Sequence, residues 1–317
     1  MSGPLQTTAM KVGAASFSYP QGSAVSVASA GYLIDANIYA AGFRAGELIH
    51  NSFSYHFVPA GSMMETGAHA LGCTRVQLVI RSKDTLTSPQ QAAANELFAR
   101  RRSGEPIAYL TGEREFFGLS FAVTPDVLIP RHETELLVEF ALARAPDGAG
   151  VLDLGTGSGA IAVAVAAARP DLSVTACDRS DAALAIAAHN NARLAQSRVR
   201  LVNSDWYAAL DALRFAVIVA NPPYIAARDP HLDQGDLRFE PRGALTDEAD
   251  GLAAIRKIVT DAPRHLGAPG WLALEHGWDQ AQAVRDLLNA RGFVEVASRR
   301  DLAGIERMSC GRWPRAD

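Results

Sequence analysis

The sequence predicts an α/β protein: a mostly parallel, twisted sheet with helices on both faces, preceded by a small helical domain and a linking β-hairpin. Three observations predict this fold. From about residue 150, short apolar strands alternate with helices, which favours parallel strands joined by crossover helices. A glycine-rich turn follows the first of these strands, and the strand at 215–220 stops at an asparagine and two prolines. Both features lie at the carboxyl end of a strand, the edge where ligands bind in open α/β sheets.

The first 61 residues form an extension with few structural signals. They are rich in Ala, Ser and Gly and carry few charges, so we expect residues 1–61 to be disordered or partly helical. The clearest helical stretch runs from Gly31 to His50, although Gly42 and Gly46 weaken it.

Residues 62–112 are predicted to form a small helical domain. Ser88 is a suitable N-cap and Pro89 suits the first helical position. Strong helix formers continue to Arg102, and Gly104 ends the helix. The arginines in the last turn fit the helix dipole better than they fit a nucleic-acid patch.

Residues 113–128 alternate apolar and polar side chains around Gly118, which predicts a β-hairpin that links two domains. The sheet domain is predicted for residues 129–317. It begins with an amphipathic helix from Glu133 to Ala143. Strands are then expected at 151–154, 173–177, 199–202, 215–220, 271–275, 293–298 and 307–312, and helices at 160–168, 181–194, 249–266 and 280–291.

Composition and charge exclude several classes of protein. A length of 317 residues indicates about two domains, and 48% hydrophobic with 20% charged residues is ordinary for a globular chain. The net charge of −4 and the pI of about 6.1 provide no basic footprint for nucleic acid. Three scattered cysteines predict neither a zinc site nor disulfides. Without a membrane-length apolar run or a secretory signal, we expect a cytoplasmic monomer with no membrane partner.

The glycine-rich turn is the candidate cofactor loop. Its Gly-x-Gly-x-Gly spacing permits a tight turn and close approach of the backbone to a ligand, and it differs from the Gly-x-Gly-x-x-Gly of dinucleotide enzymes. An acid ends the second strand, where it can bind ribose hydroxyls, and an Asp-Trp pair follows the third, where an adenine could be held. A generic βαβ turn with unrelated acids is the alternative. The predicted cofactor-binding residues are Asp153, Gly155, Thr156, Gly157, Ser158, Gly159, Asp178, Asp205 and Trp206.

The segment Asn221-Pro222-Pro223-Tyr224 is the second candidate site. Prolines fix their own φ and provide no N–H, so they stiffen the turn and end the strand. The Asn221 side chain and the backbone carbonyl of the next residue can both accept hydrogen bonds from an –NH2 group. A strand that simply ends in a proline turn is the alternative.

Together these segments resemble the class I S-adenosylmethionine-dependent methyltransferases, whose domain is Rossmann-like. More narrowly, the chain resembles the HemK/PrmC family, which methylates a glutamine side-chain amide in peptide chain release factors. The resemblance covers about residues 65–313 and departs at residues 1–61, where family members open with a helical bundle. The glycine loop and Asn-Pro-Pro-Tyr occur in other methyltransferases too. Further matching segments are Gly-Glu-Pro-Ile at 104–107, Ile-Pro-Arg at 129–131, Glu-Thr-Glu at 133–135, Arg-Phe-Glu-Pro at 238–241 and Leu-Glu-His-Gly at 274–277.

The resemblance implies methyl transfer from S-adenosyl-L-methionine, leaving S-adenosyl-L-homocysteine, to the glutamine of the Gly-Gly-Gln motif in a release factor, the protein partner. It implies no metal, and it implies that the small helical domain at 62–112 helps to engage this substrate. Asn221 and the Pro222 carbonyl would accept the two amide hydrogens, and Asn221 would also border the cofactor. The implied catalytic residues are Asn221, Pro222 and Tyr224, and the implied substrate-binding residues are Asn221, Pro222, Pro223, Tyr224 and Arg131.

Several alternatives stay open. A ribosomal-protein glutamine methyltransferase, or an adenine or guanine amino-methyltransferase of DNA or RNA, would use the same chemistry on an –NH2 group, although the acidic charge balance argues against nucleic acid. A cofactor-binding scaffold is the non-enzymatic alternative. Arg131 could position a peptide or pair with an acid, and Arg238 and Glu240 could pair with each other or shape the pocket rim. Glu275 and His276 are interpreted as structural hydrogen-bonding groups rather than as an acid–base pair.

Overall fold

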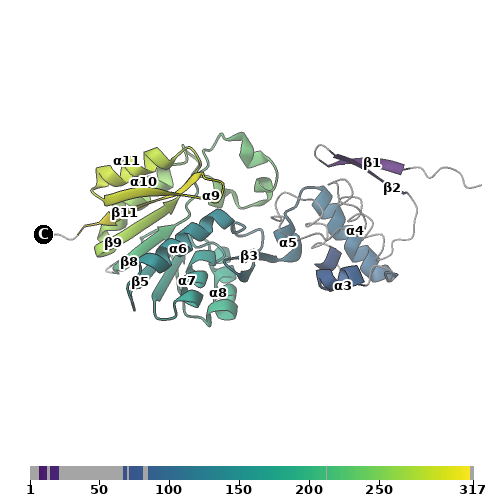
Figure 1. Ribbon diagram of the computed structural model, residues 1–317, viewed down its shortest axis with the longest axis horizontal. Coiled ribbons are helices and arrows are strands. Elements are labelled where there is room, and N and C mark those ends of the chain that lie inside the picture. The colour runs from purple at the N-terminus through teal and green to yellow at the C-terminus, as the bar shows by residue number, and fades with distance from the viewer. Residues whose placement is uncertain are drawn as a thin grey trace, which may run out of the picture. The chain divides into compact units, whose positions relative to one another are not determined.

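The computed structural model of the protein describes residues 7–12, 15–20, 67–69, 71–80, 85–211 and 213–314 (Figure 1). The chain divides into two compact units, Met1–Thr111 and Gly112–Asp317. Within the described ranges, no helix has both the length and the apolar character that crossing a membrane requires.

The N-terminal unit contains an antiparallel hairpin that the sequence analysis did not anticipate. Strands β1 (Thr7–Val12) and β2 (Ala15–Pro20) pair with Thr7 opposite Pro20. Their threonine, valine and aromatic residues favour strands, whereas the expectation of disorder or helix rested on the Ala, Ser and Gly content of the whole extension. The helix considered for Gly31–His50 lies outside the described residues.

Helices α3 (Arg75–Ile80), α4 (Ser88–Arg102) and α5 (Ile107–Thr111) follow in the same unit. The predicted cap of α4 is wrong by one residue, because Thr87 and not Ser88 caps the helix. The Thr87 hydroxyl accepts a hydrogen bond from the Gln90 N–H, and the Gln90 side chain accepts one from the Thr87 N–H. This reciprocal pair fixes the start of the helix.

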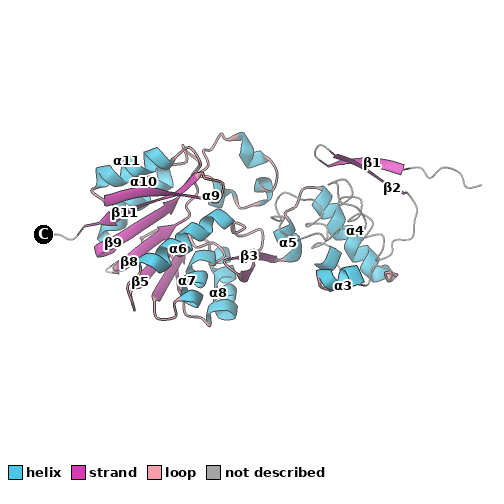
Figure 2. Cartoon of the chain, viewed as in Figure 1, coloured by secondary structure: helices cyan, strands magenta, loops and turns pink. Residues whose placement is uncertain are grey.

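A seven-stranded sheet forms the centre of the C-terminal unit and confirms the predicted α/β fold (Figure 2). The order is β10-β11-β9-β8-β5-β6-β7; the strands from β9 to β7 run parallel, and β11 lies antiparallel between β9 and β10. Chain order reverses between β5 and β8, so their carboxyl ends flank the expected ligand crevice. The strands are β5 (Gly150–Leu154), β6 (Ser173–Asp178), β7 (Arg200–Asn203), β8 (Phe215–Ala220), β9 (Leu266–Glu275), β10 (Val294–Arg300) and β11 (Glu306–Trp313).

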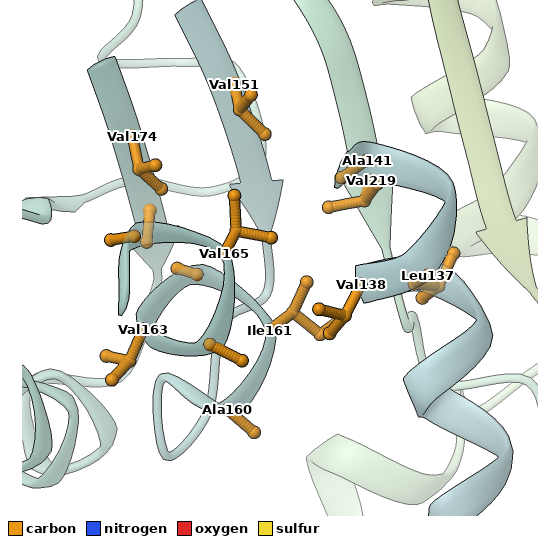
Figure 3. Close-up of a cluster of buried hydrophobic side chains, with 14 of the residues drawn as sticks. Leu137, Val138, Ala141, Val151, Ala160, Ile161, Val163, Val165, Val174 and Val219 are labelled. Carbon is orange, nitrogen blue, oxygen red and sulfur yellow. The ribbon is translucent and has the colours of Figure 1, made fainter. Parts of the chain in front are cut away.

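Helices cover both faces of the sheet because successive strand residues alternate between two hydrophobic cores. On one face, Val151 and Val219 pack with α6 and α7 (Figure 3). On the other face, Leu152 and Ile218 pack with α10 and α11. The helical segments are η1 (His132–Thr134), α6 (Glu135–Arg144), α7 (Ala160–Ala168), α8 (Asp181–Ala195), η2 (Pro230–Asp233), η3 (Leu237–Phe239), α9 (Arg242–Leu245), α10 (Ala253–Asp261), η4 (Ala262–Arg264) and α11 (Ala281–Arg291).

One predicted helix, at 249–266, is shorter in the structure. Helix α10 covers its middle only, because Pro263 provides no N–H and the chain continues as η4 and then β9. Before α10, the Asp247 carboxylate accepts hydrogen bonds from backbone N–H groups and so stabilises a loop where helix was expected. The donors are Ala249, Gly251 and Ala253.

The predicted hairpin is present as β3 (Glu113–Phe116) and β4 (Leu119–Ala122). Asn190 of α8 joins it to the glycine loop. The fully buried Asn190 side chain accepts a hydrogen bond from the Ala122 N–H at 2.8 Å and donates to the carbonyls of Ala122 and Ser158 at 3.0 and 2.9 Å. A single amide therefore fixes two segments against the same helix.

We expect Asn190→Ala to lower the free energy of unfolding by about 2–4 kcal/mol, because buried backbone groups lose their hydrogen-bond partners. Urea unfolding measures this change. As a matched control, Asn289→Ala removes an exposed amide and should alter stability by no more than about 0.5 kcal/mol. Equal effects of the two substitutions would contradict the bridging role of Asn190.

Candidate active site

The glycine loop connects β5 to α7 through left-handed backbone. Gly155, Gly157 and Gly159 have φ values of +71°, +54° and +83°, which side chains other than hydrogen disfavour. The N–H groups of Gly155 and Thr156 both donate to the Cys177 carbonyl at 2.9 Å, so the loop is anchored to strand β6. A Cβ built at Gly157 would meet nothing within 4 Å, so the loop faces open space there.

Asp153 lies beneath this loop. Its Oδ2 accepts hydrogen bonds from the Thr156 hydroxyl at 2.6 Å and the Ala162 N–H at 3.3 Å, and its buried Oδ1 has no partner among the described residues. The side chain is 0% exposed, and Thr156 and Ser158 are buried too. Contact between Asp153 and a cofactor stays a prediction. Asp153 shapes the loop, and any ligand contact of Thr156 and Ser158 would come from their backbone.

The acids after the next two strands differ in their surroundings. Asp178 accepts hydrogen bonds from the N–H groups of Gly157 and Ser180, both at 2.9 Å, and so stands directly beside the glycine loop. Asp205 is exposed and forms an ion pair with Lys257 of α10 at 2.7 Å. Asp178 is therefore held against the glycine loop, whereas Asp205 is paired with a cation, and contact of either acid with a ligand stays a prediction.

Trp206 borders the loop. The residue adopts φ +56°, and its carbonyl accepts hydrogen bonds from the Ser204 hydroxyl at 2.8 Å and the Cys177 thiol at 3.3 Å. A Cβ built at Gly155 would lie 3.3 Å from the indole, so the ring packs against the loop. The glycine loop, Asp178 and the Trp206 ring thus border one candidate ligand site, the cradle, which is open at Gly157. Its chemistry fits a nucleoside, with a carboxylate for hydroxyls and a flat ring for a base.

Asn221 follows β8 directly, and its amide is held by a chain of hydrogen bonds. Asn221 Nδ2 donates to Thr134 Oγ1 at 3.1 Å, and the Thr134 hydroxyl donates to Glu275 Oε2 at 2.6 Å. The Tyr224 hydroxyl donates to the other oxygen, Glu275 Oε1, at 3.2 Å. Within the described part of the chain, nothing donates to Asn221 Oδ1 or to the Pro222 carbonyl. Two unused acceptors therefore stand at the carboxyl end of β8.

Two later segments stabilise the Asn-Pro-Pro-Tyr loop. Gln280 Nε2 donates to the carbonyls of Tyr224 and Gly251 at 3.0 and 3.3 Å, while Gln280 Oε1 accepts from the Gly277 N–H at 2.8 Å. Gly251 adopts φ +81°, and a Cβ there would lie 2.4 Å from the Tyr224 carbonyl oxygen. The loop therefore requires glycine at this position, a role that sequence reasoning missed.

Arg131 pairs with Glu240, which is one of the two roles predicted for it. The guanidinium contacts Glu240 Oε1, and Glu240 Oε2 accepts a hydrogen bond from the Ile129 N–H at 3.0 Å. Burial raises the pKa of Glu240, and Arg131 opposes that shift. The alternative pair between Glu240 and Arg238 is not the one observed. Contact between Arg131 and a peptide stays a prediction.

Two buried carboxyls near the site have raised pKa values. Burial raises the pKa of Glu275 to about 7; the hydroxyls of Thr134 and Tyr224 lower it, Glu133 raises it, and Arg307 lowers it. Burial also raises the pKa of Asp153 to about 7. Asp153 at the glycine loop, and Glu275, which Thr134 links to Asn221, therefore ionise near neutrality.

Sequence reasoning assigned no role to Thr134, although the resemblance included its Glu-Thr-Glu segment, which was an available signal. His276 takes the structural role expected of it. Its Nε2 contacts Ser309 Oγ at 2.8 Å, and its Nδ1 contacts the Gly277 carbonyl at 2.9 Å. The residues that the structure describes include no cluster of three or more His, Cys, Asp or Glu side chains suited to a metal ion.

The sheet order, the glycine loop and the Asn221 segment define the C-terminal unit as a methyltransferase domain. A family model described as the methyltransferase small domain matches residues 132–236, which include both loops. A second model, the PrmC N-terminal domain, matches residues 66–112. The chain belongs to the release factor glutamine methyltransferase family, as the sequence resemblance implied.

Two curated relatives show the membership. The release factor glutamine methyltransferase of Burkholderia pseudomallei (strain K96243) is 61% identical over 256 residues, which cover 78% of this chain and 90% of the relative. That of Bordetella pertussis (strain Tohama I) is 58% identical over 246 residues, covering 77% and 91%. The solved hMettl16 catalytic domain, in complex with MAT2A 3'UTR hairpin 1, has a TM-score of 0.51 at 14% identity and covers 72% of this chain and 81% of its own. This last likeness concerns the fold alone.

The first prediction from this site concerns Gly155. We expect Gly155→Ala to cost about 1–2 kcal/mol of stability, because φ is positive, and to weaken binding of S-adenosylhomocysteine about fivefold or more, because the new methyl displaces Trp206. Calorimetric titration measures the binding. Gly148→Ala is the matched control, since it also has positive φ but nothing within 4 Å of its Cβ. Unchanged affinity in Gly155→Ala would contradict the role of the cradle.

The second prediction concerns pH. In the unfolded chain Asp153 and Glu275 ionise near their ordinary pKa values of 3.8 and 4.5, but in the folded chain they ionise at about 7. Between these values the folded state binds more protons, so this contribution to the free energy of unfolding falls as pH rises from about 4 to 7. Urea unfolding across that pH range should show that the free energy of unfolding falls less steeply in Asp153→Asn than in the parent. The same pH dependence of stability in parent and variant would contradict a raised pKa of buried Asp153.

Proposed function

We propose that this chain transfers a methyl group to the side-chain amide nitrogen of the glutamine in the Gly-Gly-Gln motif of peptide chain release factors. The supporting observation is the pair of unused acceptors at the end of β8, Asn221 Oδ1 and the Pro222 carbonyl. A primary amide offers two N–H donors, which match two acceptors on one rigid loop. The relatives' name supports the choice of release factors as the substrate class.

An amide nitrogen is a weak nucleophile because its lone pair is delocalised into the carbonyl. Two acceptors that hold its hydrogens fix the direction of the nitrogen and stabilise the positive charge that develops on it. The prolines keep both acceptors in place, since they restrict the backbone that carries them. Alignment by two oxygen acceptors needs no metal. Tyr224 and Pro223 would form the wall of the amide pocket, and Arg131 would border the peptide.

The cradle beside this loop would hold S-adenosylmethionine, which supplies an electrophilic methyl group when it is bound. Asp178 would accept hydrogen bonds from the ribose hydroxyls, and Trp206 would contact the base. The open backbone at Gly157 permits close approach. Leu154 of β5 and Ala220 of β8 are register partners, so the glycine loop and Asn221 leave the sheet at the same level. This proximity supports a shared site for methyl donor and amide. A substrate from the translation machinery would make the enzyme cytoplasmic.

Methyl transfer from labelled S-adenosylmethionine to purified release factor tests this proposal. The parent enzyme should label the factor, and the factor's Gln→Ala variant at Gly-Gly-Gln should stay unlabelled. Asn221→Ala should lower kcat about a hundredfold or more, because the amide loses one of its two aligning acceptors. The exposed Asn289→Ala should match the parent.

Two results would overturn the proposal. Label on the Gln→Ala factor would place the methyl group elsewhere. No label on the intact factor, from enzyme that binds S-adenosylhomocysteine, would redirect the search to ribosomal protein and then to nucleic acid, whose exocyclic amino groups present the same pair of donors.

A further inference from the structure

We propose that Glu275 and Thr134 are positioning residues that set which way the Asn221 amide faces, through a directed chain of hydrogen bonds from carboxylate to hydroxyl to amide. This inference deepens the proposed function and rests on it, because the direction of the chain decides whether Asn221 offers an oxygen or an NH2 group to the substrate.

The chain begins at Glu275, the last residue of β9. Leu274 and Ala220 are register partners, so Glu275 and Asn221 leave neighbouring parallel strands at the same level. Glu275 is 2% exposed, and an ionised carboxylate so placed must be compensated by hydrogen bonds. The structure supplies two hydroxyl donors, Thr134 at 2.6 Å and Tyr224 at 3.2 Å. An ionised carboxylate only accepts, so both hydroxyls must point their protons at it.

Thr134 links the ionised Glu275 carboxylate to the Asn221 amide and so determines the orientation of that amide. A hydroxyl has one proton, and Thr134 gives it to Glu275, so toward Asn221 it can only accept. The amide must then present Nδ2 to Thr134, which leaves Oδ1 for the substrate. The two ends of an amide have nearly the same shape, so packing alone does not choose between them. The hydrogen-bond chain therefore makes the choice.

The local backbone leaves the Thr134 hydroxyl available for Glu275. Thr134 has helical dihedral angles, φ −66° and ψ −19°, at the junction of η1 and α6, and its side chain makes no cap hydrogen bond to the helix. The hydroxyl donates to Glu275 Oε2 instead. Thr134 is also 4% exposed, so water does not compete for it. The hydroxyl is therefore held between Glu275 and Asn221, which fixes the orientation of the Asn221 amide.

Protonation of Glu275 reverses the chain. A proton on Oε2 would be donated to Thr134, whose own proton would then be free to donate to Asn221 Oδ1 and turn the amide over. Charged and titratable groups around Glu275 are Glu133 from η1, Arg307 from β11 and Tyr224 from the loop after β8. Glu133 opposes ionisation and Arg307 favours it. The raised pKa of Glu275 places this reversal near neutral pH.

Thr134→Val is the decisive variant, because valine keeps the shape of threonine and removes the hydroxyl. We expect its kcat to fall about tenfold, the factor for one lost orienting hydrogen bond, while its affinity for S-adenosylhomocysteine stays close to that of the parent. Its Tm should fall, because the buried Glu275 carboxylate loses one of its two hydroxyl donors. Thr134→Ser keeps the hydroxyl and should recover most of the parent kcat. Thr175→Val, at a threonine of β6 that is 7% exposed, controls for loss of a buried hydroxyl elsewhere and should retain parent kcat.

The pH profile provides a readout that a purely structural role would not change. The parent's kcat should rise with pH through about 7, as Glu275 ionises. Thr134→Val should lose this rise, because the link between Glu275 and Asn221 is cut. A parent that labels release factor beside a Thr134→Val variant with parent kcat and pH profile would overturn the inference and leave the proposed function intact. A parent that labels nothing would instead overturn the proposed function.

Discussion

The buried carboxylate of Glu275 is the interaction on which the arrangement of the site depends. A charge taken out of water must be compensated by hydrogen bonds, and here the partners come from different elements. Thr134 reaches it from η1 and Tyr224 from the loop after β8, while Glu275 itself ends β9. The hydrogen bonds of one carboxylate therefore hold η1, the loop after β8 and the end of β9 together. They also fix Thr134, the residue that accepts the hydrogen bond of Asn221.

The parallel sheet provides the second constraint. Leu154 pairs with Ala220, and Ala220 pairs with Leu274, so three strands end at one level. The groups that directly follow these three paired residues are the glycine loop, Asn221 and Glu275. Strand register thus brings together a cradle for a nucleoside, a pair of oxygen acceptors and the acid that orients one of them. Each group lies on a strand end or a proline-stiffened turn, so little ordering remains when ligands bind.

Much of this site follows from the sequence, because strand ends are visible as apolar runs that stop at Gly, Asn or Asp. The sequence does not give the direction in which a side chain at a strand end points. Asp153, for example, is fully buried with its Oδ2 on the Thr156 hydroxyl, which its position at a strand end does not reveal. Thr134 escaped notice because its partner Asn221 is 87 residues away, a contact that only the folded chain creates. The β1–β2 hairpin was missed because small residues obscure strand propensity.

The central claim is that Asn221 Oδ1 and the Pro222 carbonyl receive the two hydrogens of a glutamine amide. A crystal structure with S-adenosylhomocysteine and a Gly-Gly-Gln peptide tests it most directly. The account predicts that the glutamine amide nitrogen lies about 2.7–3.2 Å from both oxygens, with Asn221 Nδ2 still on Thr134. A glutamine amide held by other groups, or an Asn221 amide turned toward the peptide through its NH2, would contradict the account.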